Sequence, residues 1–272
     1  MARLPSLSRC VLDRNTGEQH FQITRYAPRP ALEPFVEHFW IVRWNLGERP
    51  PYRQSVLSHP AVNLTIIRAG TAIDAGITGL VRGNFSYTLR GEGRVFGVLF
   101  RPASFAAFVN IPQAELTDKR LALAEVFGPR GTAFQQKLLS LPDRDDELVE
   151  CAEAFLSSLQ PQQTVPLRCI QNIVDWIVAE REVTRVDQVV AYAGMPTRTL
   201  QRLFQQYVGA TPKWVIQRSR LHEATARLTS EHASVCHLAY VLGYADQAHF
   251  IRDFKRAVER TPAAYARGAR LK

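Results

Sequence analysis

Arginine and glutamine side chains recur at helical spacing along TRTLQRLFQQYV (197–208). Three of them, Arg198, Gln201 and Arg202, fall on one side of the helix that this stretch predicts, away from its apolar residues. An arginine can hold the O6 and N7 atoms of guanine, and a glutamine the N6 and N7 atoms of adenine, each through two hydrogen bonds. The spacing therefore predicts a helix that reads base edges in the major groove of duplex DNA.

The chain repeats this pattern fifty residues later, where DQAHFIRDFKRAV (246–258) predicts a second helix of the same kind. Alignment of 199–212 with 249–262 gives fourteen positions and five identities. The identical pairs are Arg202/Arg252, Phe204/Phe254, Val208/Val258, Thr211/Thr261 and Pro212/Pro262. A purely structural helical bundle is the alternative, because solvated basic helices are common. A duplication that preserves Arg, Phe and the closing Thr-Pro favours two readers.

Each candidate reading helix follows a shorter helix and a turn that contains glycine, which is the arrangement of a helix-turn-helix motif. In the first unit (184–208), residues 185–193 predict the supporting helix and Gly194 the turn. Thr184 with Asp187 resembles a capping box at the start of that helix. The apolar back of the reading helix consists of Leu200, Leu203, Phe204 and Tyr207.

In the second unit (234–258), SVCHLAYVLGY predicts the supporting helix and turn, with Ser234 as the N-cap. Residues 212–230, between the units, are long enough for a rigid linker helix of about 25 Å. Two readers in one chain could then enter successive major grooves on one face of DNA, about 34–36 Å apart. The inward-facing residues of the second reading helix would be Phe250, Phe254, Ala257 and Val258.

Composition agrees with a nucleic-acid partner and excludes several other classes of protein. Residues 161–272 contain 16 Lys and Arg against 9 Asp and Glu, a net charge of +7, whereas 1–160 carry only +2. Such an asymmetry suggests a polyanionic partner. No stretch approaches the roughly 18 uninterrupted apolar residues of a membrane span, and the N-terminus lacks the apolar segment of a secretory signal. We therefore expect a cytoplasmic protein.

The first 160 residues predict an α+β domain: a small β-barrel or sandwich plus helices. Helical spacing of apolar residues follows the strands, around 104–109, 131–140 and 145–159. The short β-rich runs, punctuated by glycine and proline, are 55–70, 72–80, 84–93 and 94–103.

The polar segment SLQPQQTVPLR (158–168) is a plausible joint. We therefore expect an effector-sensing or dimerising domain at 1–160. An all-α domain at 161–272 would hold the two helix-turn-helix units and their linker helix.

Residues 167–268 resemble the DNA-binding domain of the AraC-type transcription regulators. The resemblance rests on GMPTRTLQRLF and VGATP in the first unit, on Arg220–Leu221 in the linker, and on LGYADQAHFIRDFKR with the later TP in the second. It implies a seven-helix domain in which one helix bridges two helix-turn-helix units. DNA would be the partner.

The resemblance assigns roles to residues of both reading helices. The base-reading residues would be Arg198, Gln201, Arg202, Gln247, Ala248, Ile251 and Arg252. Contacts to phosphates, which fix register rather than sequence, would come from Thr197, Gln205, His249, Lys255 and Arg256.

Three positions depart from the family's pattern. Pro196 stands where the family usually has Ser, so capping would fall to Thr197. Ala248 occupies a position that is often Ser. Glu259 replaces a Gly, which removes the easy left-handed cap and places a negative charge near a helix end that prefers cations. The first reader is nearer to the family pattern, so we expect it to carry more of the sequence specificity.

The N-terminal half resembles, less specifically, the domain that precedes this module in one group of these regulators, through 26–46, 56–66 and 97–108. This resemblance implies a domain for sensing a small-molecule effector or for forming a homodimer. Activation through contact with RNA polymerase is the usual mode of the AraC-type family, which favours an activator over a repressor. A small molecule would bind inside the β unit, lined from strands 56–66 and 95–101.

The residues that build catalytic and metal sites are dispersed. No His-x-His motif appears, and His20, His38 and His59 lie in different segments, so His59 is predicted to be a loop or core residue rather than a metal ligand. No nucleophile, phosphate-loop or zinc-protease motif is present. We therefore expect no enzyme, no cofactor and no metal site. The cysteines, predicted to be reduced and mostly buried, are Cys10, Cys151, Cys169 and Cys236.

An aromatic cluster is expected near the start of the N-terminal half, with a packing role in the core or an interface rather than as walls of a ligand pocket. Its members would be Phe35, Phe39, Trp40 and Trp44.

The sequence thus predicts a sequence-specific regulator of transcription, controlled through its N-terminal domain. The alternative is a small-molecule-binding protein whose helical half is a protein-interaction module.

Overall fold

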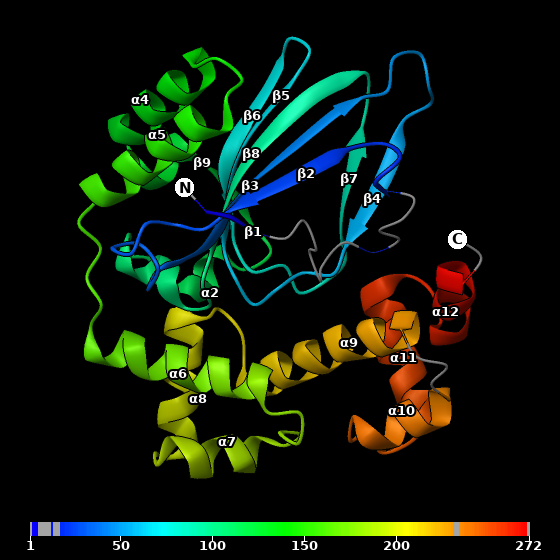
Figure 1. Cartoon of the computed structure of the whole chain (residues 1–272). Helices are drawn as coiled ribbons and strands as arrows, with labels where there is room; N and C mark the ends of the chain where they lie inside the picture. Colours follow the sequence, from blue (N-terminus) through cyan, green and yellow to red (C-terminus); the bar gives the residue numbers. More distant parts are fainter. Residues whose placement is uncertain (1, 5–11, 13–16, 231–233, 271–272) are drawn as a thin grey trace.

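The structure is a computed structural model and describes residues 2–4, 12, 17–230 and 234–270. A β-rich half, with helices along one side, stands above a wholly helical half (Figure 1). The predicted order, an α+β part followed by an all-α part, is confirmed.

Seven antiparallel strands form the main sheet, in the order β1-β2-β3-β8-β5-β6-β9. A separate ribbon pairs β4 (Tyr52–Val56) with β7 (Phe85–Leu89). The predicted strand run 55–70 is therefore divided between two sheets. The strands of the main sheet are β1 (Arg3–Leu4), β2 (Gln22–Tyr26), β3 (Val36–Asn45), β5 (Asn63–Ala69), β6 (Ala72–Thr78), β8 (Glu92–Phe100) and β9 (Arg120–Ala122).

The ribbon packs on one face of the main sheet and helices pack on the other, so the sandwich is lopsided. Leu89 of the ribbon is buried with Trp44 and Val95 of the sheet. On the opposite face, Phe39 and Phe96 are fully buried in a core that continues into the helices.

The aromatic residues of β3 do not form one cluster, and that prediction is wrong. Side chains alternate between the faces of a strand, so Phe39 lies on the helix side, with Phe35, and Trp40 lies on the ribbon side, with Trp44. Trp40 lies so close to the backbone of β8 that a Cβ added at Gly97 would sit 2.1 Å from its ring. The glycine is required by this close approach.

Helical segments follow β8 in the chain, two before the edge strand β9 and three after it. They are the 3-10 helix η1 (Ser104–Ala107), α2 (Gln113–Leu116), α3 (Leu123–Phe127), α4 (Pro129–Ser140) and α5 (Asp145–Ser158).

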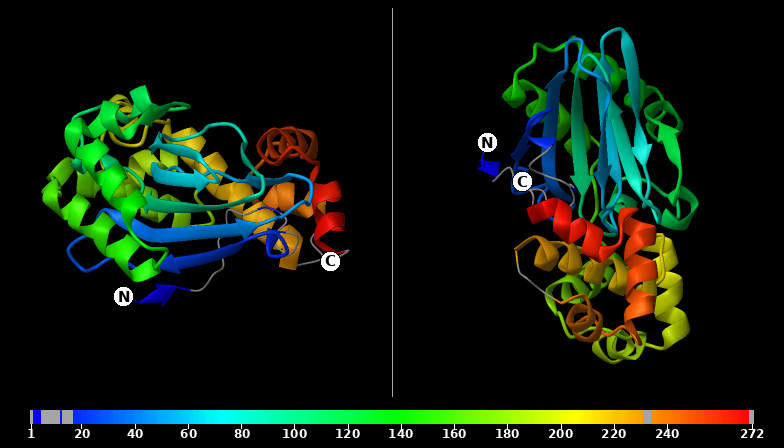
Figure 2. Two further views of the ribbon diagram at one scale, coloured as in Figure 1. Left: turned by 90° about the horizontal axis from the view of Figure 1, so that it is seen from above. Right: turned by 90° about the vertical axis from the view of Figure 1, so that its right-hand side faces the viewer.

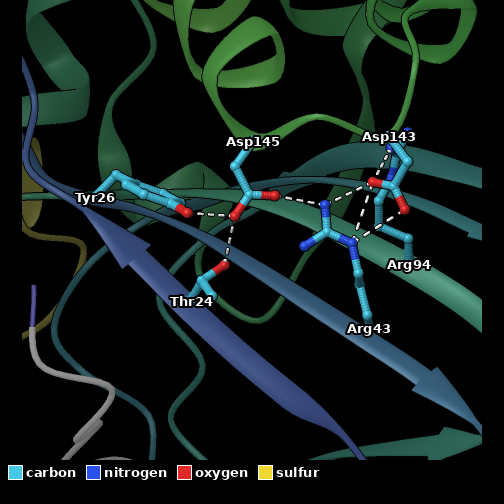
Figure 3. Close-up of polar contacts among 6 residues, drawn as sticks. All are labelled: Thr24, Tyr26, Arg43, Arg94, Asp143 and Asp145. Carbon is cyan, nitrogen blue, oxygen red and sulfur yellow. Dashed lines mark hydrogen bonds and ion pairs between the residues drawn. The ribbon is translucent and has the colours of Figure 1, made fainter. Parts of the chain in front are cut away.

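A polar network fixes the start of α5 against the sheet (Figure 3). The carboxylate of Asp145 accepts hydrogen bonds from Thr24 Oγ1 (3.0 Å), from Tyr26 Oη and from Arg43 Nη2 (2.5 Å). Asp143, in the loop before α5, accepts from Arg43 Nη2 at 2.6 Å. Its other donor, Arg94 Nη1 of β8, also lies at 2.6 Å. The two carboxylates therefore hold the α4–α5 pair to strands β2, β3 and β8.

Acid is expected to weaken this attachment. The hydrogen bond from Arg43 lowers the pKa of Asp143 from 3.8 to about 2. Burial alone would raise the pKa of Asp145, but its hydrogen bonds from Tyr26 and Arg43 outweigh burial and lower it. Because both folded pKa values lie below the unfolded value, the stability they contribute is complete above about pH 4 and is lost as the pH falls toward 2. Thermal unfolding at pH 7, 4 and 2.5 measures this loss.

An Asp143→Asn variant should unfold at a lower temperature at pH 7 and lose less on acidification. The control is Glu150→Gln, an exposed position on α5, the helix that follows Asp143, which should keep the wild-type pH profile. If the unfolding temperatures of wild type and Asp143→Asn depended on pH in the same way, Asp143 would not be the residue whose protonation weakens the attachment of α5 to the sheet.

Within the described residues, seven helices follow the joint, the number that the resemblance to the AraC-type domains implies. Residues 159–164 are not helical. The helices are α6 (Val165–Ala179), α7 (Val186–Ala193), α8 (Thr197–Tyr207), α9 (Pro212–Ser230), α10 (Val235–Val241), α11 (Gln247–Val258) and α12 (Pro262–Arg270).

The caps of the first unit differ from the prediction. Gln188, not Asp187, closes the start of α7, because its Oε1 accepts from the backbone N–H groups of Thr184 and Arg185, both at 2.9 Å. Asp187 pairs with Arg185 instead. The N-cap of α8 is Pro196, and no side chain caps the helix. The predicted capping by Thr197 is therefore wrong.

The apolar cores do not separate at residue 160. One core runs from the main sheet through Phe105 of η1 into α6 and α8 of the first helix-turn-helix unit. The core of the second unit includes Leu12 and Leu57 from the N-terminal half. The boundary between 1–160 and 161–272 stays a prediction.

The thiols are less buried than predicted. Cys151 is buried and Cys169 half-buried, but Cys236 is exposed, and all three are free. Cys10 lies outside the described residues. Over the described ranges, no helix is long and apolar enough to cross a membrane.

Candidate nucleic-acid interface

The first reading helix, α8, buries one side and exposes the other. Leu200 and Phe204 are fully buried, which pins the helix against α6 and the rest of the first unit. The predicted base-reading residues Arg198, Gln201 and Arg202 are exposed. Between 17 and 230 and between 234 and 270, none of the ion pairs that the structure shows engages Arg198 or Arg202. Their guanidinium groups are therefore available to an external acceptor.

The turn before α8 places it across its support. Gly194 adopts a left-handed conformation (φ +61°), and its N–H donates to the carbonyl of Val190 at 3.1 Å to end α7. A left-handed residue ends a helix without steric cost when it is glycine. Thr197 and Gln205, predicted to contact phosphates, are exposed at the two ends of α8.

The second reading helix, α11, has a firm cap that the sequence prediction did not assign. Asp246 Oδ1 accepts from the N–H of His249 at 2.7 Å. An aspartate directly before an amphipathic helix is a recognisable N-cap signal. Phe250 and Phe254 are fully buried, and the second unit packs around them. Among the predicted base-reading residues, Gln247, Ala248 and Arg252 are exposed, and Ile251 is half-buried.

Two residues predicted to contact phosphates have partners inside the protein. His249 Nε2 lies 3.5 Å from Asp253 Oδ2, and Arg256 Nη2 lies 2.7 Å from Asp253 Oδ1. Asp253 is itself buried. The spacings i, i+3 and i, i+4 could have indicated both pairs from the sequence. Lys255 is exposed, and in the described part of the chain it forms no ion pair.

The linker helix α9 holds the two units at a fixed separation. Its 19 residues span about 28 Å at a rise of about 1.5 Å per residue. In the right-hand view of Figure 2, α8 (yellow) and α11 (orange-red) stand upright at the same edge of the helical half. The two units also touch directly, because a Cβ added at Gly243 would lie 2.9 Å from Cβ of Thr184. This arrangement presents both reading helices on one face.

The N-terminal half contains a cavity of about 320 Å³. It lies between the β7 strand of the ribbon and the β6–β9 edge of the main sheet. The effector site expected along strands 56–66 and 95–101 stays a prediction. Its walls include Ile67, Phe85 and Tyr87, and charged residues such as Arg120 line it too. Burial raises the pKa of Tyr87 to about 12, so its hydroxyl stays protonated at neutral pH.

His59, the histidine that stands out in the sequence, lies at the junction of the two halves. Its ring stacks on His222 of α9 at 4.3 Å between centroids, and His222 Nε2 lies 3.1 Å from the carbonyl oxygen of Ser58. Within the described residues, no group of three or more His, Cys, Asp or Glu side chains is placed to hold a metal ion.

Two known families match parts of the chain. Residues 24–122 match a domain of unknown function (DUF6597), and residues 189–268 match a helix-turn-helix domain.

Several proteins with similar sequences are described as transcriptional activators. The HTH-type transcriptional activator RhaS of Pectobacterium carotovorum is 37% identical over 68 residues, which is 25% of this chain and 24% of that protein. The transcriptional activator NphR of a Rhodococcus species is 25% identical over 240 residues, 88% of this chain and 61% of that protein. The chain thus spans about a quarter of the length of the first curated relatives that it matches.

Among solved structures, ToxT from Vibrio cholerae is 12% identical, with 92% of this chain and 98% of that chain covered and a TM-score of 0.44. An AraC-type regulator from Chromobacterium violaceum is 24% identical, with 38% and 92% covered and a TM-score of 0.35.

Proposed function

We propose that this chain, whose residues 189–268 match a helix-turn-helix domain, is a regulator of the AraC type that binds duplex DNA sequence-specifically and regulates transcription. The observation that carries the proposal is the pair of reading helices on one face of the helical half, with Arg198, Arg202 and Arg252 exposed. Arginine and glutamine on such helices supply the paired donors that base edges in the major groove accept.

The regulator is an activator in this proposal, because the relatives RhaS and NphR are described as activators. RNA polymerase is then the protein partner, and the chain works in the cytoplasm, with no catalytic role.

The cavity in the N-terminal half is the place for a small-molecule effector. The chain acts alone on one site or as a homodimer on two. An effector would act by shifting the population between two presentations of the reading helices.

Gel-shift experiments test this proposal. Fragments of genomic DNA, and a random duplex of equal length, are titrated with the protein at several salt concentrations. A DNA-binding regulator should select a few fragments strongly and should release all DNA progressively as salt rises. Failure to shift any duplex at low salt would overturn the proposal and favour a protein-interaction role for the helical half.

Replacing Lys255 by alanine is expected to weaken binding to selected and random DNA alike. The ammonium group is exposed near the end of α11 and would neutralise one phosphate, which carries no sequence information. The slope of log affinity against log salt should fall in magnitude by about one. Lys137→Ala, at an exposed position of α4 in the N-terminal half, is the charge-matched control and should leave the slope unchanged. A loss confined to the selected duplex would contradict the phosphate role.

A further inference from the structure

Positions 209 and 259 are equivalent in the fifty-residue repeat, and both end a reading helix. Gly209 follows the end of α8, and its φ is +84°. Glu259 caps α11 with φ +62°. A left-handed conformation suits glycine but is disfavoured for a residue that has a Cβ. The presence of a glutamate at the second position therefore calls for a compensating contact.

The N-terminal half contacts the first of these turns. Thr117, directly after α2, donates from Oγ1 to the carbonyl oxygen of Gly209 at 2.7 Å. The fit is tight, because a Cβ added at Gly209 would lie 2.6 Å from Thr117 Oγ1 and 2.7 Å from the carbonyl oxygen of Gln113. The turn is buried, so the lost hydrogen bond would leave its carbonyl unsatisfied.

The N-terminal half also contacts the second turn, from a different element. Arg53 Nη2 on β4 lies 3.4 Å from Glu259 Oε2. The guanidinium is oriented by Ser86 on β7, which accepts from Arg53 Nε at 3.0 Å. Just beyond β4, Leu57 enters the core of the second unit. This ion pair is a contact that the glycine of the AraC-type pattern could not make at position 259.

Both contacts adjoin the cavity of the N-terminal half. Ser86, which holds Arg53, lines that cavity, and so does Asp118, the residue after Thr117. Asp118 also accepts from Arg82 Nε at 2.7 Å. The carbonyl oxygen of Arg82 in turn accepts from Arg218 Nη2 of the linker helix at 2.6 Å. The walls of the cavity are thus connected to both reading helices and to the helix between them.

We propose that the N-terminal half sets the angle between the two reading helices by holding the same repeat position in each, through Thr117 on Gly209 and Arg53 on Glu259. The base-reading residues lie toward the opposite, N-terminal ends of α8 and α11. A small shift of the ribbon relative to α2 therefore tilts one reader against the other. This inference rests on the proposed function and adds the residues through which the N-terminal half acts.

The experiment measures how strictly the protein requires one spacing between its two contacted DNA segments. The probes are a duplex selected by the wild-type chain from a random pool and the same duplex with one base pair inserted between the two segments. The ratio of the two affinities is the spacing discrimination. Arg53→Glu and Glu259→Arg are each expected to lower this ratio by about threefold, as exposed ion pairs are weak. The double variant Arg53→Glu with Glu259→Arg should restore it.

Restoration in the double variant separates the contact from general damage to the fold. A cation near the end of α11 is favourable for the helix, so Glu259→Arg should not unfold it. Arg90→Glu, exposed on the loop after β7, is the control for the change in net charge and should leave the ratio unchanged.

Thr117→Val tests the first contact with an isosteric side chain. Loss of a hydrogen bond to a buried carbonyl should lower the spacing discrimination by about fivefold, while Thr132→Val on the exposed side of α4 should have no effect. Unchanged ratios in Thr117→Val, Arg53→Glu and Glu259→Arg, with DNA selection intact, would overturn this inference and leave the proposed function standing. Failure of the wild-type chain to select any duplex would overturn the proposed function itself.

Discussion

Replacing Arg202 by alanine is expected to lower affinity for the selected duplex by about 1–3 kcal/mol and to relax specificity at one base pair. Its guanidinium is exposed on α8, between the exposed Arg198 and Gln205 and opposite the buried Phe204. Within the described residues Arg202 forms no ion pair. Its guanidinium therefore gains two hydrogen bonds in the groove without giving up an ion pair inside the protein. Binding to single-base variants of the selected duplex measures the effect.

The repeat provides a matched control for this prediction. Arg252 is the equivalent residue of α11, but its neighbours at the reading positions include Ala248 and the half-buried Ile251, which offer no paired donors. The loss from Arg202→Ala should therefore exceed the loss from Arg252→Ala. Equal losses on selected and random DNA for Arg202→Ala would count against base reading and would reassign this residue to the phosphates.

The helical half could be predicted from the sequence because its signals are local. Glycine at 194 and the apolar spacing of Leu200 and Phe204 act within one or two turns of a helix, and the repeat shows such a local pattern twice. The errors there are local too. Gln188 and Asp187 lie side by side, and both can accept from the backbone before α7, so sequence alone does not choose between them.

The β half was predicted less completely because its pairing is remote in sequence. Strand β3 pairs with β8, in a register that places Ile41 opposite Phe96. No hairpin turn connects these two strands, so no local signal in the sequence indicates that they pair. The aromatic residues of β3 were read as one cluster because alternation between faces becomes visible only when the strand itself is recognised. The cavity could not be predicted for the same reason, since its walls include residues of β5, β6, β7 and β9.

The residues that make contacts between the two halves were the hardest to predict from the sequence. Neither Arg53 nor Thr117 belongs to a motif in its own segment, so no local pattern indicates that they contact residues 259 and 209. The one available clue was the glutamate at 259, where the family pattern has glycine. A departure from a backbone-driven preference indicates that another interaction opposes it, but its partner could be found only in the folded chain.

Replacing Leu57 by alanine is expected to destabilise the second helix-turn-helix unit more than the first. Leu57 belongs to the N-terminal half, yet it is fully buried among residues of α9, α10 and α11. Removing a buried leucine side chain costs about 2–5 kcal/mol, depending on how far the site collapses. The second unit is small and its core includes Leu57, so its amides in α10–α12 should exchange faster with deuterium, while those of α6–α8 keep their protection.

The same variant should shorten the footprint on the selected duplex to the segment contacted by α8. Leu64→Ala is the matched control, because Leu64 is equally buried but lies within the core of the main sheet. Leu64→Ala should lower the stability of the N-terminal half without a selective increase in amide exchange in α10–α12. If Leu57→Ala left exchange in α10–α12 unchanged, the second unit would fold without help from the N-terminal half. The two reading helices would then differ in sequence preference but not in their dependence on the rest of the chain.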